Sequence, residues 1–171
     1  MTRNNVYVHD NKEIHVKRQN RKSLALRIAP SGEIVLLIPY WVKPSHPQVK
    51  RFIRQSLQEL DTHLPETPPA QLHTAKSVRK LVDDWSVRMG LTPKKVQMRT
   101  MYRKWGSCSS RGNITLNTAL YYLPLHLVEY IVVHELVHLD IFDHSPAFWS
   151  KLGEHLPNCA ERERELNVYH V

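Results

Sequence analysis

The sequence predicts an α+β fold, with short strands early in the chain and helices late. Before residue 40, short β-branched and apolar runs flank clusters of turn-forming residues, as they do in β-hairpins. After residue 45, apolar residues recur at helical spacing, ending in a long apolar stretch over residues 123–142. Strands followed by helices, rather than alternating with them, are typical of α+β proteins.

Two hairpins are predicted from four apolar runs. Val6–His9 and Glu13–Lys17 flank an Asp-Asn-Lys turn, and Leu24–Ala29 and Glu33–Ile38 flank a Pro-Ser-Gly turn. A polar, basic loop over residues 18–22 separates the two hairpins.

The rest of the chain is predicted to be mostly helical. Ser45 is a candidate N-cap for the first helix, and Gly90 is a candidate C′ residue that stops the second. The predicted elements are a helix from Ser45 to about His63, a helix over residues 78–89, strands Val96–Thr100 and Asn113–Asn117, and helices from Pro124 to about Phe142, from Ser145-Pro146, and over Ala160–Leu166.

Length and composition exclude several classes of protein. The chain has 171 residues, of which 42% are hydrophobic and 23% charged, so it is neither disordered nor collagen-like. The N-terminus lacks the apolar core of a signal peptide, and the apolar stretch over residues 123–142 contains too many ionisable side chains for a membrane span. Cys108 and Cys159 lie far apart and form no C-x-x-C pattern, which argues for a reducing compartment. We therefore expect a cytoplasmic protein with no membrane partner.

The positive charge is concentrated in the first third of the chain. Residues 1–55 contain eleven Lys or Arg and three acidic residues, a balance that equals the whole net charge of +8. One interpretation is a surface for nucleic acid or nucleotide phosphates, and the other is a solvated face that keeps the protein soluble.

The sequence His134-Glu135-Leu136-Val137-His138 is an H-E-x-x-H pattern. Residues at i and i+4 of a helix project from one face, so His134 and His138 can share one Zn²⁺. Glu135 is then placed to act as a general base on a water molecule. The surrounding helix is apolar on nearly every face, so its polar side chains would be costly to bury without a metal to pair them.

A catalytic zinc site needs a third protein ligand. His144 follows His138 by six residues, which is the spacing of the third histidine in metzincins. Those proteins carry a glycine at the position of Ile141, so the turn must be made differently here, for example by ending the helix near Asp143. Other candidates for the third ligand are Glu154, Glu161 and Glu163.

Segments on both sides of this helix resemble the YgjP-like zinc metallopeptidases, which are related to the WLM and SprT families. The resemblance lies in Trp105-Gly106-Ser107-Cys108-Ser109, Gly112–Asn117 and His144–Trp149, and it is strong over residues 96–156. It implies a minimal zincin-like fold, with His134, His138 and His144 as zinc ligands and Glu135 as catalytic base. Asp143 departs from the family, where asparagine is more frequent.

The same resemblance implies a binding site for peptide or protein substrates. In zincin-like proteins, the strand that corresponds to Asn113–Asn117 is an edge strand that binds an extended peptide by strand addition. Asn113, Thr115 and Asn117 are the candidate substrate-binding residues. We expect a single domain over residues 1–171, in which residues 1–63 form the basic hairpins and first helix and residues 75–171 form the zinc-binding catalytic core.

Two interpretations of the Trp-Gly-Ser-Cys segment stay open. Cys108 is either a fourth metal ligand, which would keep the site latent, or part of a tight turn in which Gly106 adopts an unusual φ.

The principal hypothesis is a zinc-dependent peptidase. The alternatives are a metal-dependent hydrolase of nucleotide phosphoanhydrides, such as a pyrophosphatase, and a nucleic-acid-associated, SprT-like zinc protein. The nucleic-acid hypothesis rests on the basic residues of positions 1–55, among them Arg18, Arg21, Lys22, Arg27, Lys50, Arg51 and Arg54.

Overall fold

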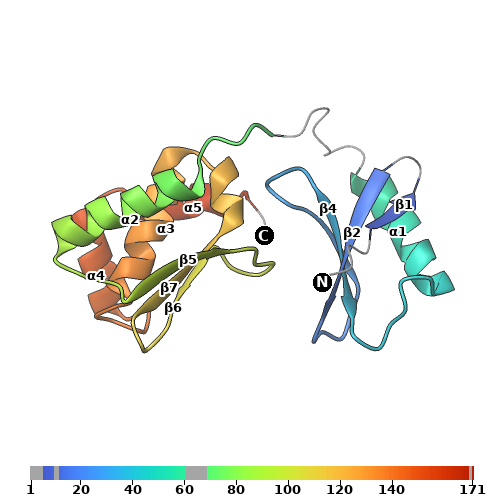
Figure 1. Ribbon diagram of the computed structural model, residues 1–171, viewed down its shortest axis with the longest axis horizontal. Coiled ribbons are helices and arrows are strands. Elements are labelled where there is room, and N and C mark those ends of the chain that lie inside the picture. Colours follow the sequence, from blue (N-terminus) through green and yellow to red (C-terminus); the bar gives the residue numbers. More distant parts are fainter. Residues whose placement is uncertain (1–5, 10–11, 61–68, 170) are drawn as a thin grey trace. The chain divides into compact units, whose positions relative to one another are not determined.

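The chain folds into two compact units, formed by residues 1–69 and 70–169 (Figure 1). The computed structural model describes residues 6–9, 12–60, 69–169 and 171. The boundary between the two units, at residues 69 and 70, lies between the two predicted parts of the chain, residues 1–63 and 75–171. These two parts were expected to form a single domain. The elements are β1 (Val6–His9), β2 (Lys12–Gln19), β3 (Ala25–Ile28), β4 (Ile34–Pro39), α1 (Pro47–Leu60), α2 (Ala75–Met89), β5 (Lys95–Arg99), β6 (Gly106–Cys108), β7 (Asn113–Asn117), the 3₁₀ helix η1 (Thr118–Tyr122), α3 (Leu125–Val137), α4 (Pro146–His155) and α5 (Cys159–Leu166).

Unit 1 contains a four-stranded sheet in the order β1-β2-β4-β3. Both predicted hairpins are confirmed, because β1 pairs with β2 and β3 pairs with β4 in antiparallel fashion. Parallel pairing of β2 with β4 joins the hairpins into one sheet. All residues of β4 are buried, as expected for a central strand with a continuous apolar sequence.

Helix α1 supplies the other half of the core of unit 1. Its apolar residues recur at helical spacing, so Val49, Ile53 and Leu57 face the sheet and are buried with residues of β2 and β4. The sequence predicted that this helix would end near His63. The described part of the helix reaches Leu60, and residues 61–68 lie outside the described part of the chain.

Unit 2 contains a three-stranded sheet in the order β5-β7-β6. Strand β7 lies in the middle, parallel to β5 and antiparallel to β6. Strands β5 and β7 were predicted from the sequence. One of the two interpretations of the Trp-Gly-Ser-Cys segment was a tight turn with an unusual φ at Gly106, and this interpretation was wrong: Gly106 begins strand β6, and the described glycines with positive φ are Gly32, Gly90 and Gly112.

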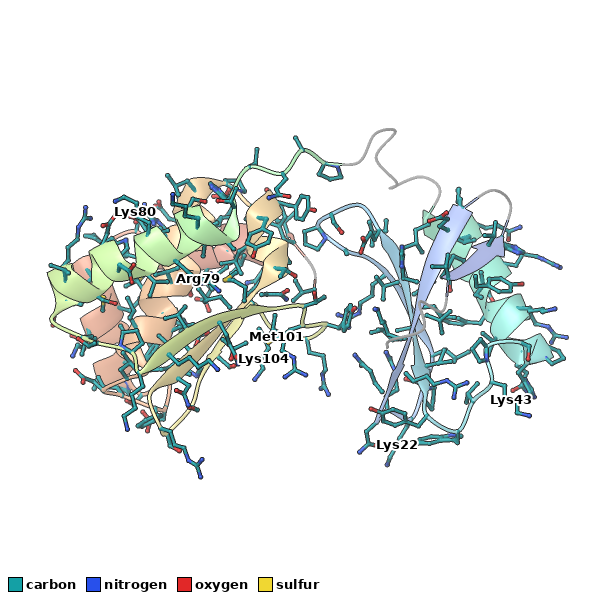
Figure 2. All side chains as sticks on the ribbon, in the orientation of Figure 1. Lys22, Lys43, Arg79, Lys80, Met101 and Lys104 are labelled. Atoms are coloured by element: carbon teal, nitrogen blue, oxygen red, sulfur yellow. The ribbon has the colours of Figure 1, made fainter. Side chains whose placement is uncertain are left out.

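The buried side chain of Asn117 anchors the loop between β5 and β6. Its amide nitrogen donates to the carbonyl oxygens of Met101 and Lys104, and its amide oxygen accepts from the backbone N–H groups of Met101 and Ala119. Figure 2 labels Met101 and Lys104 in this loop. The amide therefore holds the chain that leads into β6.

Helix α3 forms the centre of unit 2. It packs against α2, α4, α5 and strand β6, and most of its residues are buried. The apolar sequence predicted a helix to about Phe142, but the helix ends at Val137 with His138 as its C-cap. The backbone then tightens, because the N–H of Leu139 donates to Leu136 and that of Asp140 donates to Val137. Within the described residues, no helix combines the length and apolar character that crossing a membrane requires.

Candidate metal centre

Three imidazole rings meet at the end of α3. His134 lies in the last turn of α3, His138 caps that helix, and His144 precedes α4. The Nε2 atom of His134 lies 3.2 Å from Nε2 of His138 and 3.1 Å from Nε2 of His144. Among the described residues, these three form the group whose ligand atoms converge closely enough to hold a metal ion.

The spacing of these nitrogens fits a tetrahedral ion. Zinc–imidazole bonds of about 2.05 Å at tetrahedral angles place the ligand nitrogens about 3.3 Å apart. The hydrogen bonding of His138 supports the same assignment, because its Nδ1 lies 2.9 Å from the carbonyl oxygen of Ile141. A carbonyl oxygen only accepts, so Nδ1 carries the proton and Nε2 of the neutral ring keeps a free lone pair.

Burial keeps two of the rings neutral. Removal from water, reinforced by the neighbouring His138 and His144, lowers the pKa of His134 to about 3. Burial also lowers the pKa of His138, against the opposing effect of its hydrogen bond to Ile141. Neutral imidazole is the form that binds a cation, so this environment suits a ligand set.

Helix α4 supplies an aromatic floor beneath the cluster. The ring of Phe148, which is fully buried, has its centroid 4.9 Å from His134, 4.6 Å from His138 and 4.8 Å from His144. The indole Nε1 of Trp149 donates to the backbone carbonyl of His144 at 3.1 Å. Sequence reasoning assigned no role to either aromatic residue. The sequence did contain a signal for them. Phe148 and Trp149 follow His144 by four and five residues, and about one turn of helix at that spacing brings a side chain back next to His144.

The chain turns from α3 to α4 without a glycine. After the tight turn at Leu139 and Asp140, the carboxylate of Asp143 accepts from the backbone N–H of Ser145. A hydrogen bond from the Ser145 side chain, followed by this backbone hydrogen bond, lowers the pKa of Asp143. The resulting turn starts α4 at Pro146 and leaves His144 next to the other two imidazoles.

Glu135 is packed against the backbone of β6. Its side chain is 5% exposed, and its Oε2 atom has no hydrogen-bond partner among the described residues. A Cβ atom added at Gly106 would lie 2.4 Å from Oε1 of Glu135. Gly106 is therefore required for close approach of a side chain, not for an unusual φ. Burial raises the pKa of Glu135 to about 8, although nearby Lys104 opposes the shift.

The other candidate ligands do not join this cluster. Among the described residues, the converging group excludes Cys108, Glu154, Glu161 and Glu163. The Cys108 thiol donates to the carbonyl oxygen of Ser109, and burial, followed by the charge of Glu135, raises its pKa. A raised pKa disfavours the thiolate that metal binding requires.

The expectation that Asn113–Asn117 is an edge strand was wrong. Strand β7 is paired on both sides, and therefore has no free edge for a peptide. Thr115 accepts a hydrogen bond from the side chain of Gln97, and Asn117 is buried in the loop anchor described above. Pairing between distant strands decides which strand lies at the edge, and the sequence of one strand does not show it.

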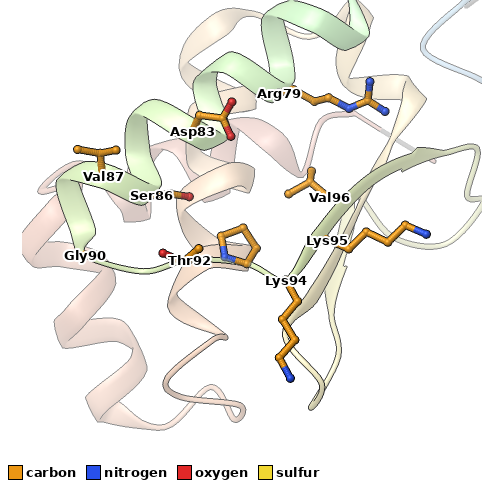
Figure 3. Close-up of a pocket in the computed structure, with 10 residues that line it drawn as sticks. Arg79, Asp83, Ser86, Val87, Gly90, Thr92, Lys94, Lys95 and Val96 are labelled. Carbon is orange, nitrogen blue, oxygen red and sulfur yellow. The ribbon is translucent and has the colours of Figure 1, made fainter.

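Unit 2 also contains a groove of about 560 Å³ between α2 and β5 (Figure 3). None of the three histidines lines it. Its walls are formed by Arg79, Asp83, Ser86, Val87, Gly90, Thr92, Pro93, Lys94, Lys95 and Val96.

Three imidazoles converging beside a buried carboxyl are typical of metallohydrolases. Residues 70–169 match the YgjP-like family, described as a YgjP-like metallopeptidase domain. This match spans more than half of the chain and includes the whole histidine cluster. The chain therefore belongs to the YgjP-like metallopeptidase family and is a metallohydrolase.

The matches among solved structures include two metallopeptidase zymogens. The metallopeptidase zymogen abylysin of Pyrococcus abyssi is 26% identical with a TM-score of 0.48, and the match covers 55% of this chain and 99% of abylysin. The metallopeptidase zymogen jannalysin of Methanocaldococcus jannaschii is 22% identical with a TM-score of 0.47, and the match covers 52% of this chain and 92% of jannalysin. A comparison with curated protein sequences finds no significant match.

Proposed function

We propose that this protein is a zinc-dependent peptidase in which His134, His138 and His144 hold the ion. The observation that carries the proposal is the convergence of three Nε2 atoms, with those of His138 and His144 3.2 and 3.1 Å from that of His134, together with the hydrogen bond that sets the tautomer of His138. Zinc is the preferred occupant, because it accepts nitrogen ligands in a tetrahedral arrangement and leaves a fourth position for chemistry.

Glu135 is the proposed general base. When bound, zinc supplies Lewis acidity that polarises a peptide carbonyl and makes water more acidic. The ionised form of Glu135 accepts a proton from that water and transfers it to the leaving amine. Its buried Oε2 atom has no hydrogen-bond partner among the described residues. The floor formed by Phe148 keeps water away from the inner side of the three imidazoles.

We propose that an extended peptide substrate pairs with the free edge of β6, and that β6, not β7, is the peptide-binding strand. Strand β6 lies at the edge of the sheet, and its first residue, Gly106, contacts Glu135. A peptide added to this edge would pass close to the general base. This assignment replaces Asn113, Thr115 and Asn117 as the peptide-binding strand.

Replacing Glu135 by Gln tests the role of the base. We expect E135Q to bind one zinc ion but to hydrolyse peptides about 10²–10⁴-fold more slowly, because the amide cannot accept the proton. Zinc content by elemental analysis and new peptide termini by mass spectrometry of a digested peptide library measure the two effects. E154Q is the matched control, since Glu154 is exposed on α4 and lies outside the cluster.

Either of two outcomes would contradict this proposal. E135Q that cleaves peptides at the native rate would remove Glu135 as the base. Replacing His144 by Ala without loss of zinc affinity would remove the third ligand. The family match does not favour phosphoanhydride hydrolysis, and phosphate or pyrophosphate release by the zinc-loaded protein without peptide cleavage would reverse that preference.

A further inference from the structure

Two loops of unit 1 meet at one end of its sheet. Strands β2 and β4 run parallel, with Arg18 opposite Ile38 and Gln19 opposite Pro39. Parallel strands end at the same edge of a sheet, so the segments that follow them begin side by side. Residues 20–24 and 40–46 therefore form one surface, which we call the β2–β4 end.

The β2–β4 end presents two aromatic rings to solvent. Tyr40 is 61% exposed and Trp41 is 67% exposed. The N–H of Val42 donates to the carbonyl of Pro39, which makes Tyr40 and Trp41 the central residues of a hydrogen-bonded turn. Large adjacent aromatic rings left in water are typical of surfaces that bind another molecule.

The aromatic turn is held by the chain that follows it. A second turn follows at once, because the N–H of His46 donates to the carbonyl of Lys43, and Pro44 lies inside this turn. Proline restricts the backbone of that segment. A rigid loop loses little conformational entropy when a ligand stacks on its rings.

Exposed cations lie at the same end of the sheet as these two aromatic residues. Arg18, Lys22 and Lys43 are exposed, and none of them has an ion-pair partner among the described residues. Figure 2 labels Lys22 and Lys43 at the same end of the sheet. Across residues 12–58 there are ten Lys or Arg and only two acidic residues. Those two, Glu13 and Glu33, lie at the opposite end, since they precede the first paired residues of β2 and β4.

We propose that the β2–β4 end binds single-stranded nucleic acid. Phosphates contact Arg18, Lys22 and Lys43, and bases stack on Tyr40 and Trp41. Flat rings flanked by uncompensated cations suit a ligand that carries both π faces and regularly spaced anions. A duplex hides its base faces, so the single strand is the preferred form.

The test measures binding of the full-length protein to fluorescein-labelled oligo(dT) and oligo(U) by anisotropy. We expect both to bind, because stacking and phosphate contacts do not require a particular base. If Arg18, Lys22 and Lys43 each contact one phosphate, affinity should fall about 20-fold between about 50 and 200 mM salt. A duplex of the same length should bind more weakly.

Substitutions at Trp41 separate stacking from apolar contact. W41F keeps an aromatic face and should bind close to the native level, whereas W41L keeps an apolar side chain and should bind about 5- to 150-fold more weakly. The K22Q/K43Q variant should reduce the salt slope by about 1.4, since about 0.7 is lost for each phosphate contact. K76Q/K95Q is the matched control, because it removes two exposed lysines from unit 2.

Three results would overturn the proposal. These are no binding of either oligonucleotide at low salt, equal binding by W41L and the native protein, and equal loss in the two double-lysine variants. Vesicles of phosphatidylglycerol and phosphatidylcholine provide a further arm. Vesicle binding that W41L retains, without oligonucleotide binding, would identify the surface as membrane-binding instead. Circular dichroism of every variant checks that unit 1 stays folded.

Discussion

Position 106 requires glycine because a neighbouring side chain lies against it, and not because its backbone adopts a positive φ. The absence of a Cβ atom there allows the Glu135 carboxyl to lie against β6. Glycine at a positive φ can often be anticipated from turn sequences, as at Gly90 after α2. Glycine required by a residue 29 positions later cannot, because the contact exists only after α3 packs on the sheet.

Replacing Gly106 by Ala should therefore displace Glu135. We expect G106A to keep its zinc and to lose about 10²-fold in peptide hydrolysis, because a general base moved by about 1 Å loses its alignment. The matched control is G153A: a Cβ atom at Gly153 in α4 meets nothing within 4 Å, and alanine favours helix. Equal activity of G106A and G153A would show that the position of Glu135 does not depend on this contact.

The raised pKa of Glu135 gives a stability change with a defined sign. The carboxyl pKa is about 8 in the folded, metal-free protein and 4.5 as its reference value. Between these values the folded state holds a proton that the unfolded state has released, so stability falls as pH rises. Thermal melting in chelator at about pH 5 and pH 8 should show native protein losing stability relative to E135Q, which lacks the titrating carboxyl. Parallel pH profiles would exclude a raised pKa at this carboxyl.

At the scale of elements, the local sequence pattern predicted where strands and helices occur better than it predicted which strands pair with one another. Turn residues and apolar runs were sufficient for both hairpins of unit 1, because these contacts are local. The i, i+4 spacing predicted that His134 and His138 share a face, and the structure brings His144 to them. Strand β6 was missed because three residues carry no periodicity, and the middle position of β7 depends on pairing with β5 and β6.

The end of α3 also could not be predicted from the local sequence pattern. The apolar sequence continues through Leu139 and Ile141, so periodicity alone extends the helix to Phe142. In the structure the chain leaves the helix at His138, and the ring nitrogen of His138 donates to the carbonyl of Ile141. Tertiary contacts at the histidine cluster therefore override the local pattern.

The loop between β5 and β6 should depend on Asn117. The N117A variant removes four hydrogen bonds to backbone groups, and we expect a loss of about 3 kcal/mol in the free energy of unfolding. N113A, at the other end of β7, serves as the control and should change stability by less than about 0.5 kcal/mol. Chemical denaturation of both variants measures the difference. If N117A were as stable as N113A, the amide would not anchor the loop.

At the scale of the whole molecule, the described residues form two hydrophobic cores. One is built from residues of β2, β4 and α1, and the other from α2 to α5 with the three-stranded sheet. Neither core contains a residue of the other unit, and the family match begins at residue 70, where unit 2 begins. A unit with its own core can fold on its own.

We therefore expect residues 70–171 to fold alone, bind one zinc ion and cleave the same peptides as the full chain. Calorimetry should give one cooperative transition for the shorter chain and a more complex profile for the full protein. The full chain with E135Q controls for contaminating peptidases. A shorter chain that is unfolded by circular dichroism would show that unit 2 needs unit 1.

Separate cores also affect how the sequence can change over evolutionary time. A mutation that weakens the packing of α1 on its sheet lowers the free energy of unfolding of unit 1. The free energy of unfolding of unit 2, which contains the histidine cluster, stays unchanged. The surface of unit 1 can thus vary in charge and aromatic content while the geometry of His134, His138 and His144 is preserved. In a lineage of such proteins, the proposed ligand of unit 1 can be exchanged without changing the metal site in unit 2.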